Sequence, residues 1–205
     1  MEEPRNHRLF VALEPPEAVR RRIAQAEAGL RRGAGRAAED VRWVPAENVH
    51  LTLQFLGAVP HDRVAAVAAA VAAAAAASRP LALEVKGAGG FPNARRARVL
   101  WLGLGGELAA LAALVQDLGG RLAPLGFAPE ARPFAPHLTL GRARDGRGAP
   151  GMGGALAEAA LAEGVGWRST EVVLFESHLS PKGARYEAGA RARLGPGDVR
   201  LPRGP

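Results

Sequence analysis

The sequence predicts an α+β protein with two pseudo-symmetric lobes. Each lobe has an antiparallel sheet with helices outside, and a central groove separates the lobes. One observation is the tetrapeptide His-Leu-Thr-Leu, which occurs at residues 50–53 and again at 137–140. A second is that strand-like and helix-like segments follow one another in an order that roughly repeats in the second half of the chain. This mixture favours α+β architecture in one bilobal domain over residues 1–205, rather than a doubly wound nucleotide fold.

The repeated tetrapeptide is the more specific of these observations. The chain has 5 histidines and 3 threonines among 205 residues, so independent scattering would give about 0.07 occurrences of His-x-Thr. The pattern occurs twice, inside the same four residues, which we call the first word (50–53) and the second word (137–140). Two strand faces that resemble each other by accident are therefore the weaker interpretation.

Each word has the alternation of a half-buried strand. In the first word this places His50, Thr52 and Gln54 on one face. The opposite face then carries Leu51, Leu53 and Phe55. The second word repeats the arrangement, and a pseudo-two-fold relation would bring both polar faces to the groove. Histidine exchanges protons near neutral pH, so two imidazoles in one groove are suited to general acid–base catalysis.

The other segments complete the two lobes in order. Apolar runs predict strands at residues 8–13, 81–85, 98–104, 171–179 and 186–194, with a short extended piece at 42–44. Helices are predicted after Pro16, from Pro60 to Ala77, from Glu107 to Leu122, and over residues 155–163. Glycine-rich stretches predict loops at 87–97 and 145–154, and the tail at 195–205 is expected to be loose.

Composition excludes several classes of site. The chain has no cysteine, so it has no disulfide framework, thiol nucleophile or cysteine-based zinc site. The net charge is +7 and 25 of the 27 basic residues are arginine, a residue suited to phosphate, although compositional bias also explains them. The N-terminus lacks an apolar signal segment, and the apolar run at 64–77 is too short to span a bilayer. We expect a cytoplasmic monomer.

The paired words and their surroundings resemble a known family. The segments that carry the resemblance are RLFVAL, WVPAENVHLTLQFLG, RVLWLG, PHLTLGR and LFESHLSPKGARY, which together span nearly the whole chain. They are similar to the RNA 2′,3′-cyclic phosphodiesterases, also called 2′-5′ RNA ligases, of the 2H phosphoesterase superfamily. The resemblance implies hydrolysis of a ribose 2′,3′-cyclic phosphate to the 2′-phosphate. In some members it also implies ATP-independent, reversible joining of RNA ends through a 2′-5′ bond.

The resemblance also implies roles for the words. His50 matches the proton donor and His137 the proton acceptor, while Thr52 and Thr139 match the hydroxyls that hold the phosphate. Arg142 matches a phosphate-binding arginine. Strict alternation puts Arg142 on the wrong face, so it reaches the groove only if the strand bends at Gly141.

Other candidates have two interpretations each. Arg95 and Arg96 either line the groove or are solvated loop charges, and Phe91, Phe134 and Tyr186 either stack a base or belong to the core. No metal or other cofactor is expected, because each word offers one nitrogen beside a threonine, and a catalytic zinc needs about three protein ligands. The expected partner is RNA with a 2′,3′-cyclic phosphate end, such as a tRNA fragment, with no membrane. The alternatives are a 2H phosphoesterase acting on a small cyclic nucleotide and a non-catalytic RNA-binding module.

Overall fold

The computed structural model describes residues 6–158, 164–180, 183–195 and 199–200. Within these residues one antiparallel sheet has the strand order β10-β9-β8-β1-β3-β6-β5-β4-β7, and β2 pairs with β6. The strands are β1 Asn6–Leu13, β2 Val41–Trp43, β3 Leu51–Pro60, β4 Leu81–Phe91, β5 Val99–Gly106, β6 His137–Ala143, β7 Val165–Ser169, β8 Glu171–Ser180, β9 Gly183–Arg193 and β10 Val199–Arg200. The α-helices are α1 Glu17–Ala34, α2 Val64–Ala77, α3 Leu108–Leu122 and α4 Met152–Glu158.

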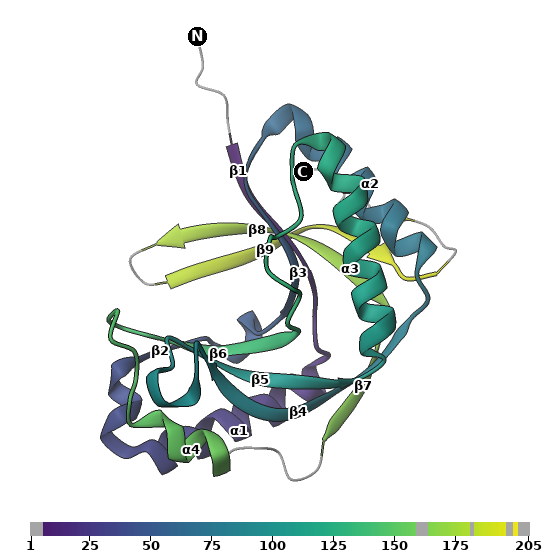
Figure 1. The fold of residues 1–205 in the computed structure, drawn as a ribbon. Coiled ribbons are helices and arrows are strands. Elements are labelled where there is room, and N and C mark those ends of the chain that lie inside the picture. Colours follow the sequence, from purple (N-terminus) through teal and green to yellow (C-terminus); the bar gives the residue numbers. More distant parts are fainter. Residues whose placement is uncertain (1–5, 159–163, 181–182, 196–198, 201–205) are drawn as a thin grey trace.

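The sheet consists of two half-sheets with a narrow junction. Strands β3 and β6 share a single register pair, Leu51 with Leu138. The first half-sheet runs from β10 to β3, and the second contains β6, β5, β4, β7 and β2. Figure 1 shows the half-sheets turning away from each other beyond this junction. Because Leu51 and Leu138 belong to the two words, the junction brings the words together.

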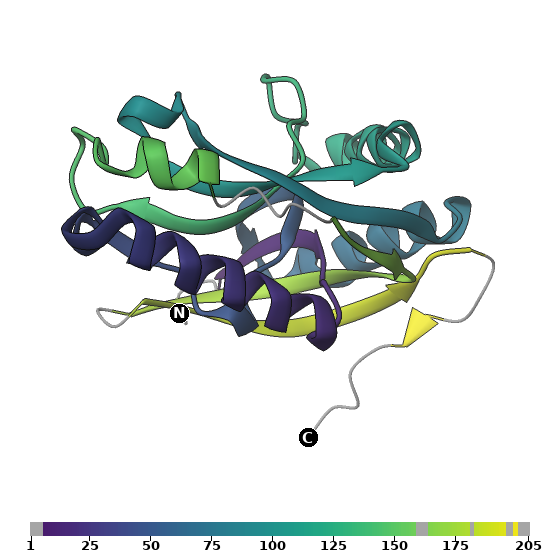
Figure 2. The same ribbon diagram turned by 90° about the horizontal axis from the view of Figure 1, so that it is seen from below.

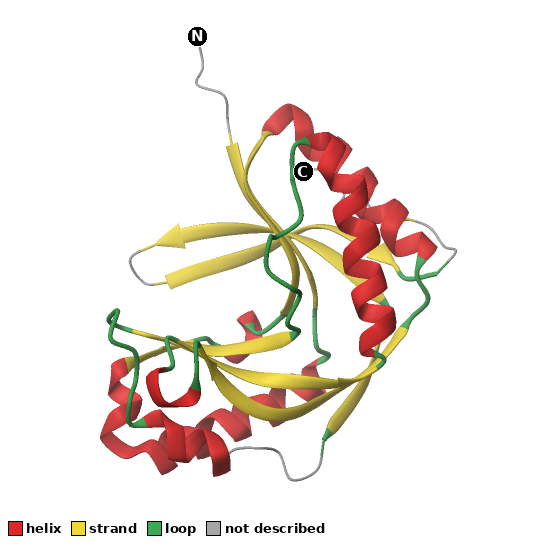
Figure 3. Ribbon diagram, in the orientation of Figure 1, coloured by secondary structure: helices red, strands yellow, loops and turns green. Residues whose placement is uncertain are grey.

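Helices cover the outside of both half-sheets, as Figure 3 shows in red. Helices α2 and α3 pack together, and α2 also contacts β8 and β9 of the first half-sheet. Helices α1 and α4 lie side by side and contact β7 and β4 of the second (Figure 2). The predicted α+β fold with two lobes is therefore confirmed. The lobes are not the two halves of the chain, because α1 follows a strand of the first half-sheet but packs on the second.

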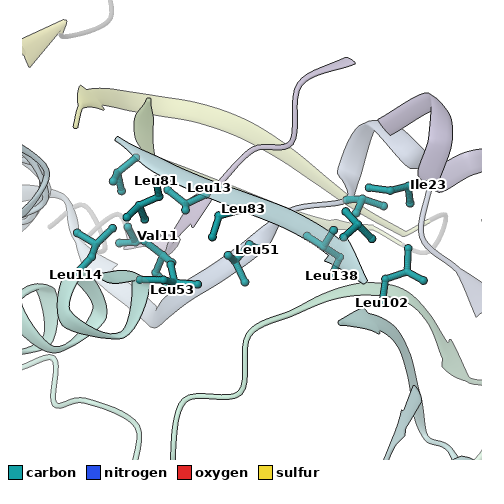
Figure 4. Packing of buried hydrophobic residues seen from close by; sticks show 14 of the residues in the cluster. Val11, Leu13, Ile23, Leu51, Leu53, Leu81, Leu83, Leu102, Leu114 and Leu138 are labelled. Carbon is teal, nitrogen blue, oxygen red and sulfur yellow. The ribbon is translucent and has the colours of Figure 1, made fainter. Parts of the chain in front are cut away.

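A continuous apolar core joins the lobes. One buried cluster includes Val11 and Leu13 of β1, Leu83 of β4, Leu114 of α3 and Leu138 of β6 (Figure 4). It therefore draws on both half-sheets and on the helices. The window Leu108–Leu125 is apolar and long enough to cross a membrane by length and composition alone. Its buried leucines belong to this same core.

Several boundaries differ from the sequence prediction. The loop predicted at 87–97 is wrong in its first part, because β4 continues to Phe91 and pairs Gly89 with Trp101. A Cβ atom on Gly89 would lie 2.4 Å from the Trp101 ring, so glycine allows strand and indole to pack closely. A single strand, at 171–179, was expected between Trp167 and Leu179, but the first residues of this segment belong to a further strand, β7, which pairs with β4 in the other half-sheet.

Two predictions fall partly outside the described residues. The helix predicted at 155–163 begins earlier, at Met152, and residues 159–163 are not described. Of the tail predicted to be loose, residues 196–198 and 201–205 are not described, whereas Val199–Arg200 pairs with β9.

Candidate active site

Both words line one pocket of about 430 Å³ at the junction of the half-sheets. His50, directly before β3, and Thr52 in β3 enter it from one half-sheet, and His137 and Thr139 enter it from the start of β6 in the other. Leu51 and Leu138, which pair with each other where β3 meets β6, are fully buried. This follows from strand alternation, which sends the apolar leucines into the core and the polar side chains to the open face.

A β-bulge follows the threonine in each word. In the pairing of β3 with β1, Thr52 and Gln54 oppose consecutive residues, so Leu53 is the extra residue. In the pairing of β6 with β5, Thr139 and Gly141 oppose consecutive residues, so Leu140 is extra. Residues 51–56 and 138–143 consequently show the same sequence of buried and exposed positions. Each bulge reverses the alternation of the strand that follows it.

The bulges place three side chains on the face opposite to the one that unbroken alternation gives them. Gln54 was expected beside His50 but is 3% exposed and donates to the carbonyls of Phe127 and Ala128. Phe55 was expected on the core face but is 53% exposed and lines the pocket. Arg142, at the equivalent position after the second bulge, also lines the pocket. Both predictions for β3 were wrong because they assumed unbroken alternation.

The backbone holds the two imidazoles in the same way. His50 Nδ1 lies 2.7 Å from the carbonyl oxygen of Asn48, and His137 Nδ1 lies 2.7 Å from that of Ala135. A carbonyl only accepts hydrogen bonds, so Nδ1 must carry a proton in both rings. In each neutral imidazole Nε2 then has the free lone pair, and in each protonated imidazole Nε2 can donate its proton. Either ring is therefore equipped to act as a base or as an acid through Nε2.

His50 lies on an aromatic surface of the first half-sheet. Its ring centroid is 4.7 Å from that of Phe10 and 5.1 Å from that of Tyr186, which meets it edge-on. Burial lowers the pKa of the His50 imidazole, and the positive charges of Arg142 and His137 act in the same direction. The hydrogen bond to Asn48 and the carboxylate of Glu14 oppose this shift. His50 in the free protein therefore favours the neutral form more than an ordinary histidine does.

His137 faces a second, larger pocket as well. This pocket has a volume of about 930 Å³ and shares Thr52, Phe55, His137 and Arg142 with the first. Phe91 lines it and meets the His137 ring edge-on at 5.0 Å. The two pockets thus adjoin at these four shared residues, and His50 lines only the first of them.

The remaining candidates are divided between these pockets and the surface. Tyr186 lines the first pocket, and Phe91 and Phe134 line the second. Arg95 and Arg96 are exposed in a 3₁₀ turn, Ala94–Arg96, and line neither of the two pockets. Sequence reasoning missed Phe10. The alternation of residues 9–11 in the sequence would have placed Phe10 on the face opposite Leu9 and Val11, which belong to the main core cluster.

The other three histidines line neither of the two pockets. His7 is within hydrogen-bonding distance of Glu176 and of His61, and His178 lies 3.4 Å from a carboxylate oxygen of Glu187. In the described part of the chain, no group of three or more His, Asp or Glu side chains is placed to hold a metal ion. The lining of the first pocket instead includes two imidazoles, the hydroxyls of both word threonines and the guanidinium of Arg142, a set that suits an anion undergoing proton transfer.

Comparisons with known proteins agree with this arrangement. Residues 13–101 and 105–186 match the family described as LigT like Phosphoesterase, and each segment contains one word. A protein of Methanothermobacter thermautotrophicus named RNA 2′,3′-cyclic phosphodiesterase is 31% identical over 179 residues, which cover 87% of this chain and 94% of that protein. A protein of Thermus thermophilus with the same name is 31% identical, covering 93% of this chain and 97% of its own.

Solved structures give the same result for the fold. The crystal structure of TT0787 of Thermus thermophilus has a TM-score of 0.75 and 27% identity, covering 91% of this chain and 97% of that one. The crystal structure of E. coli LigT complexed with 3′-AMP has a TM-score of 0.70 and 28% identity, covering 93% of this chain and 99% of that one. The similarity therefore extends over both half-sheets and both words.

Proposed function

Because this chain belongs to the LigT-like phosphoesterases of the 2H superfamily, we propose that it opens the 2′,3′-cyclic phosphate at an RNA end and leaves a 2′-phosphate. The observation that carries the proposal is the pair of imidazoles in one pocket, each with Nδ1 bound to a carbonyl and Nε2 available. A binding module would need only positive charge. Two histidines held in the same tautomer serve proton transfer.

The proposed reaction uses one histidine on each side of phosphorus. Neutral His137 takes a proton from water through Nε2 as the water oxygen attacks. Protonated His50 gives its Nε2 proton to the departing 3′ oxygen. The attacking and departing oxygens lie roughly in line in such a displacement, so acid and base must stand on opposite sides. Thr52, Thr139 and Arg142 donate hydrogen bonds to the non-bridging oxygens, where negative charge is held.

The free pocket disfavours the protonated form of His50, the form that an acid must have. The cause is burial, which lowers the pKa of this imidazole. The bound phosphate is an anion beside the ring and shifts the equilibrium back toward the imidazolium. Substrate binding and protonation of His50 are therefore coupled in this proposal.

The substrate that we propose is the end of an RNA chain. RNA is the proposed partner, including tRNA fragments with cyclic ends, and the chain's charge of +7 favours a polyanion. We also propose ligation, in which an RNA 5′-hydroxyl replaces water, forms a 2′-5′ phosphodiester and displaces the 3′ oxygen; this exchange of one phosphodiester for another is reversible. We propose a monomer that needs no metal.

The test is product analysis with purified protein. We expect 2′,3′-cyclic AMP and an oligonucleotide with a cyclic phosphate end to give 2′-phosphates, identified by ³¹P NMR. A faster reaction with the oligonucleotide supports RNA as the substrate, and equal or faster reaction with cyclic AMP favours a small nucleotide. EDTA is expected to leave the rate unchanged. No opening of either substrate, or a rate lost with EDTA and restored by zinc, overturns the proposal.

A further inference from the structure

The larger pocket is lined by His137 but not by His50, and the proposed hydrolysis assigns no group of the substrate to it. We call it the entering-side pocket, because in the proposed reaction the attacking oxygen approaches phosphorus past His137. Its volume of about 930 Å³ compares with about 430 Å³ for the first pocket. A water molecule occupies only about 30 Å³. The space beside the base is therefore large enough for a group of nucleoside size attached to the attacking oxygen.

The roles proposed for the two histidines also locate the nucleoside that carries the departing 3′ oxygen. The 3′ oxygen departs beside His50, and the ribose that carries it remains joined to phosphorus through the 2′ oxygen. Because His50 lines the first pocket and not the larger one, we place the nucleoside with the cyclic phosphate in the first pocket, whose lining includes Tyr186 and Leu179. The in-line arrangement places the entering group on the other side. In this arrangement the nucleoside that carries the cyclic phosphate leaves the entering-side pocket free.

The walls of the entering-side pocket suit a flat ring next to an anionic chain. Phe91 and Phe134 supply aromatic surfaces, and Val115 of α3 adds an aliphatic one. Three arginines line the same pocket, Arg98, Arg132 and Arg142, against a single acid, Glu130. Aromatic side chains stack nucleobases without strong sequence preference, and arginines bind the phosphates between them. This combination favours a nucleotide chain over an aliphatic or uncharged alcohol.

The segment between α3 and β6 forms part of the wall of the entering-side pocket and is held to the rest of the protein. Gln54, turned inward by the bulge at Leu53, donates to the carbonyls of Phe127 and Ala128 at 3.2 and 3.3 Å. Gly119 of α3 lies beneath Pro129, and a Cβ atom there would be 3.3 Å from the proline ring. Phe134 also packs against the main core cluster. The segment between α3 and β6 is thus tied to both β3 and α3, which gives the pocket a preformed shape.

We propose that the entering-side pocket binds the nucleoside whose 5′-hydroxyl attacks phosphorus, and that Phe134 and Arg132 determine selection of this RNA 5′ end over water. The proposal rests on the roles given to His50 and His137 above. The new bond joins the 5′ oxygen to phosphorus, and the bond from phosphorus to the 3′ oxygen breaks. His137 takes the proton of the 5′-hydroxyl and His50 protonates the 3′ oxygen. No oxidant or nucleotide cofactor is consumed.

The reverse reaction gives a convenient assay. In a 2′-5′-linked diadenosine monophosphate, the second adenosine occupies the entering-side pocket, the 3′ oxygen attacks and the 5′ oxygen leaves. The product is adenosine with 2′,3′-cyclic AMP, and the latter is then hydrolysed. The ratio of kcat/KM for this dinucleotide to kcat/KM for 2′,3′-cyclic AMP therefore measures the entering-side pocket alone. Defects in the proton-transfer residues or in the first pocket affect both substrates.

The experiment compares two variants with a matched control. Phe134→Ala and Arg132→Ala are expected to lower the ratio, by about tenfold for Phe134→Ala because one base–aromatic stack is lost. Leu179→Ala is the control, because Leu179 is 69% exposed and lines only the first pocket of the two. It should change both rates together and leave the ratio unaltered. Arg132 is exposed, so its variant tests the proposal even if Phe134→Ala folds poorly.

The outcomes separate this inference from the proposed function. If the wild type hydrolyses cyclic AMP but does not cleave the dinucleotide, the inference is overturned and the proposed function stands. The inference is also overturned if both folded variants keep the wild-type ratio. If cyclic AMP itself is not hydrolysed, the proposed function fails first. A ratio that falls in both variants and not in Leu179→Ala supports the assignment of the pocket.

Discussion

The two words give their histidines the same backbone setting but different surroundings. Each imidazole donates Nδ1–H to the carbonyl two residues earlier, and each strand bulges at the last leucine of its word. Five residues after the histidine, however, the first strand presents Phe55 to the pocket and the second presents Arg142. His50 contacts Phe10 and Tyr186 in the first half-sheet, whereas His137 contacts Phe91 and borders the larger pocket.

This difference shows which features each repeat controls. The shared features fix the tautomer and the direction of Nε2, which any proton-transfer role requires. The features that differ set charge and access: one guanidinium enters from the second strand only, and the larger pocket opens beside His137 only. An internally repeated scaffold thus holds two equivalent side chains while their neighbours give them unequal tasks. The following predictions test that division.

Removal of either imidazole should have the largest effect. His50→Ala and His137→Ala are each expected to lower kcat/KM for 2′,3′-cyclic AMP by about 10²–10⁴-fold, the usual contribution of a general acid or base. The double variant should be little worse than the poorer single variant, because the two groups act in one step. His178→Ala, a histidine outside both pockets, should stay within about twofold of wild type. A single variant with near-normal kcat/KM would remove that histidine from the mechanism.

The next effect concerns the pair of equivalent positions, Phe55 and Arg142. Arg142→Gln should lower kcat/KM by about 10–100-fold, since a hydrogen bond to a charged group contributes about 1.5–3 kcal/mol. The kcat/KM of Arg142→Lys should lie between those of the wild type and Arg142→Gln, because lysine keeps the charge but not the forked geometry. Phe55→Ala should cost about fivefold or less, because this ring is already 53% exposed. Equal losses at the two positions would contradict the unequal tasks proposed for them.

A smaller effect should appear in the pH dependence. As the acid, His50 must be protonated, so activity falls as the pH rises through its pKa. Burial lowers that pKa in the free protein, so the alkaline limb of kcat/KM should lie below about 6.5, the ordinary value for histidine. The bound phosphate raises it, so the alkaline limb of kcat should lie at higher pH.

The control for this profile is Arg142→Gln. Arg142 is one of the charges that lower the pKa of His50, so its removal should move the alkaline limb of kcat/KM upward. Rates measured across the full pH range on both substrates give the two profiles. Because the imidazoles interact, each limb belongs to the coupled pair. An alkaline limb of kcat at lower pH than that of kcat/KM would be incompatible with His50 as the acid.

The sequence contained the words but not the bulges. Local alternation was enough to put His50 and Thr52 on one polar face and their leucines in the core. The bulges at Leu53 and Leu140 depend on how β3 pairs with β1 and how β6 pairs with β5, which are distant in the chain. The faces of Gln54 and Phe55 were therefore wrong. The carbonyls that bind both Nδ1 atoms carried no sequence signal, because every residue has one.

The last prediction tests the residue that follows the second bulge. A Cβ atom on Gly141 would lie 2.5 Å from Cγ1 of Val41, because β2 packs directly against this part of β6. Gln54 has a long side chain at the equivalent position, where it reaches the segment after α3 instead of a neighbouring strand. Gly141→Ala should therefore overpack the β2–β6 contact and cost about 1–3 kcal/mol, which for a chain of this size lowers Tm by about 2–4 °C per kcal/mol. Because Arg142 is the next residue, kcat/KM should fall as well.

Gly146→Ala is the control, since nothing lies within 4 Å of its added Cβ atom, and it should change neither quantity. If Gly141→Ala keeps the wild-type Tm measured by calorimetry, β2 can move away from β6, and glycine is not what allows Arg142 to reach the pocket.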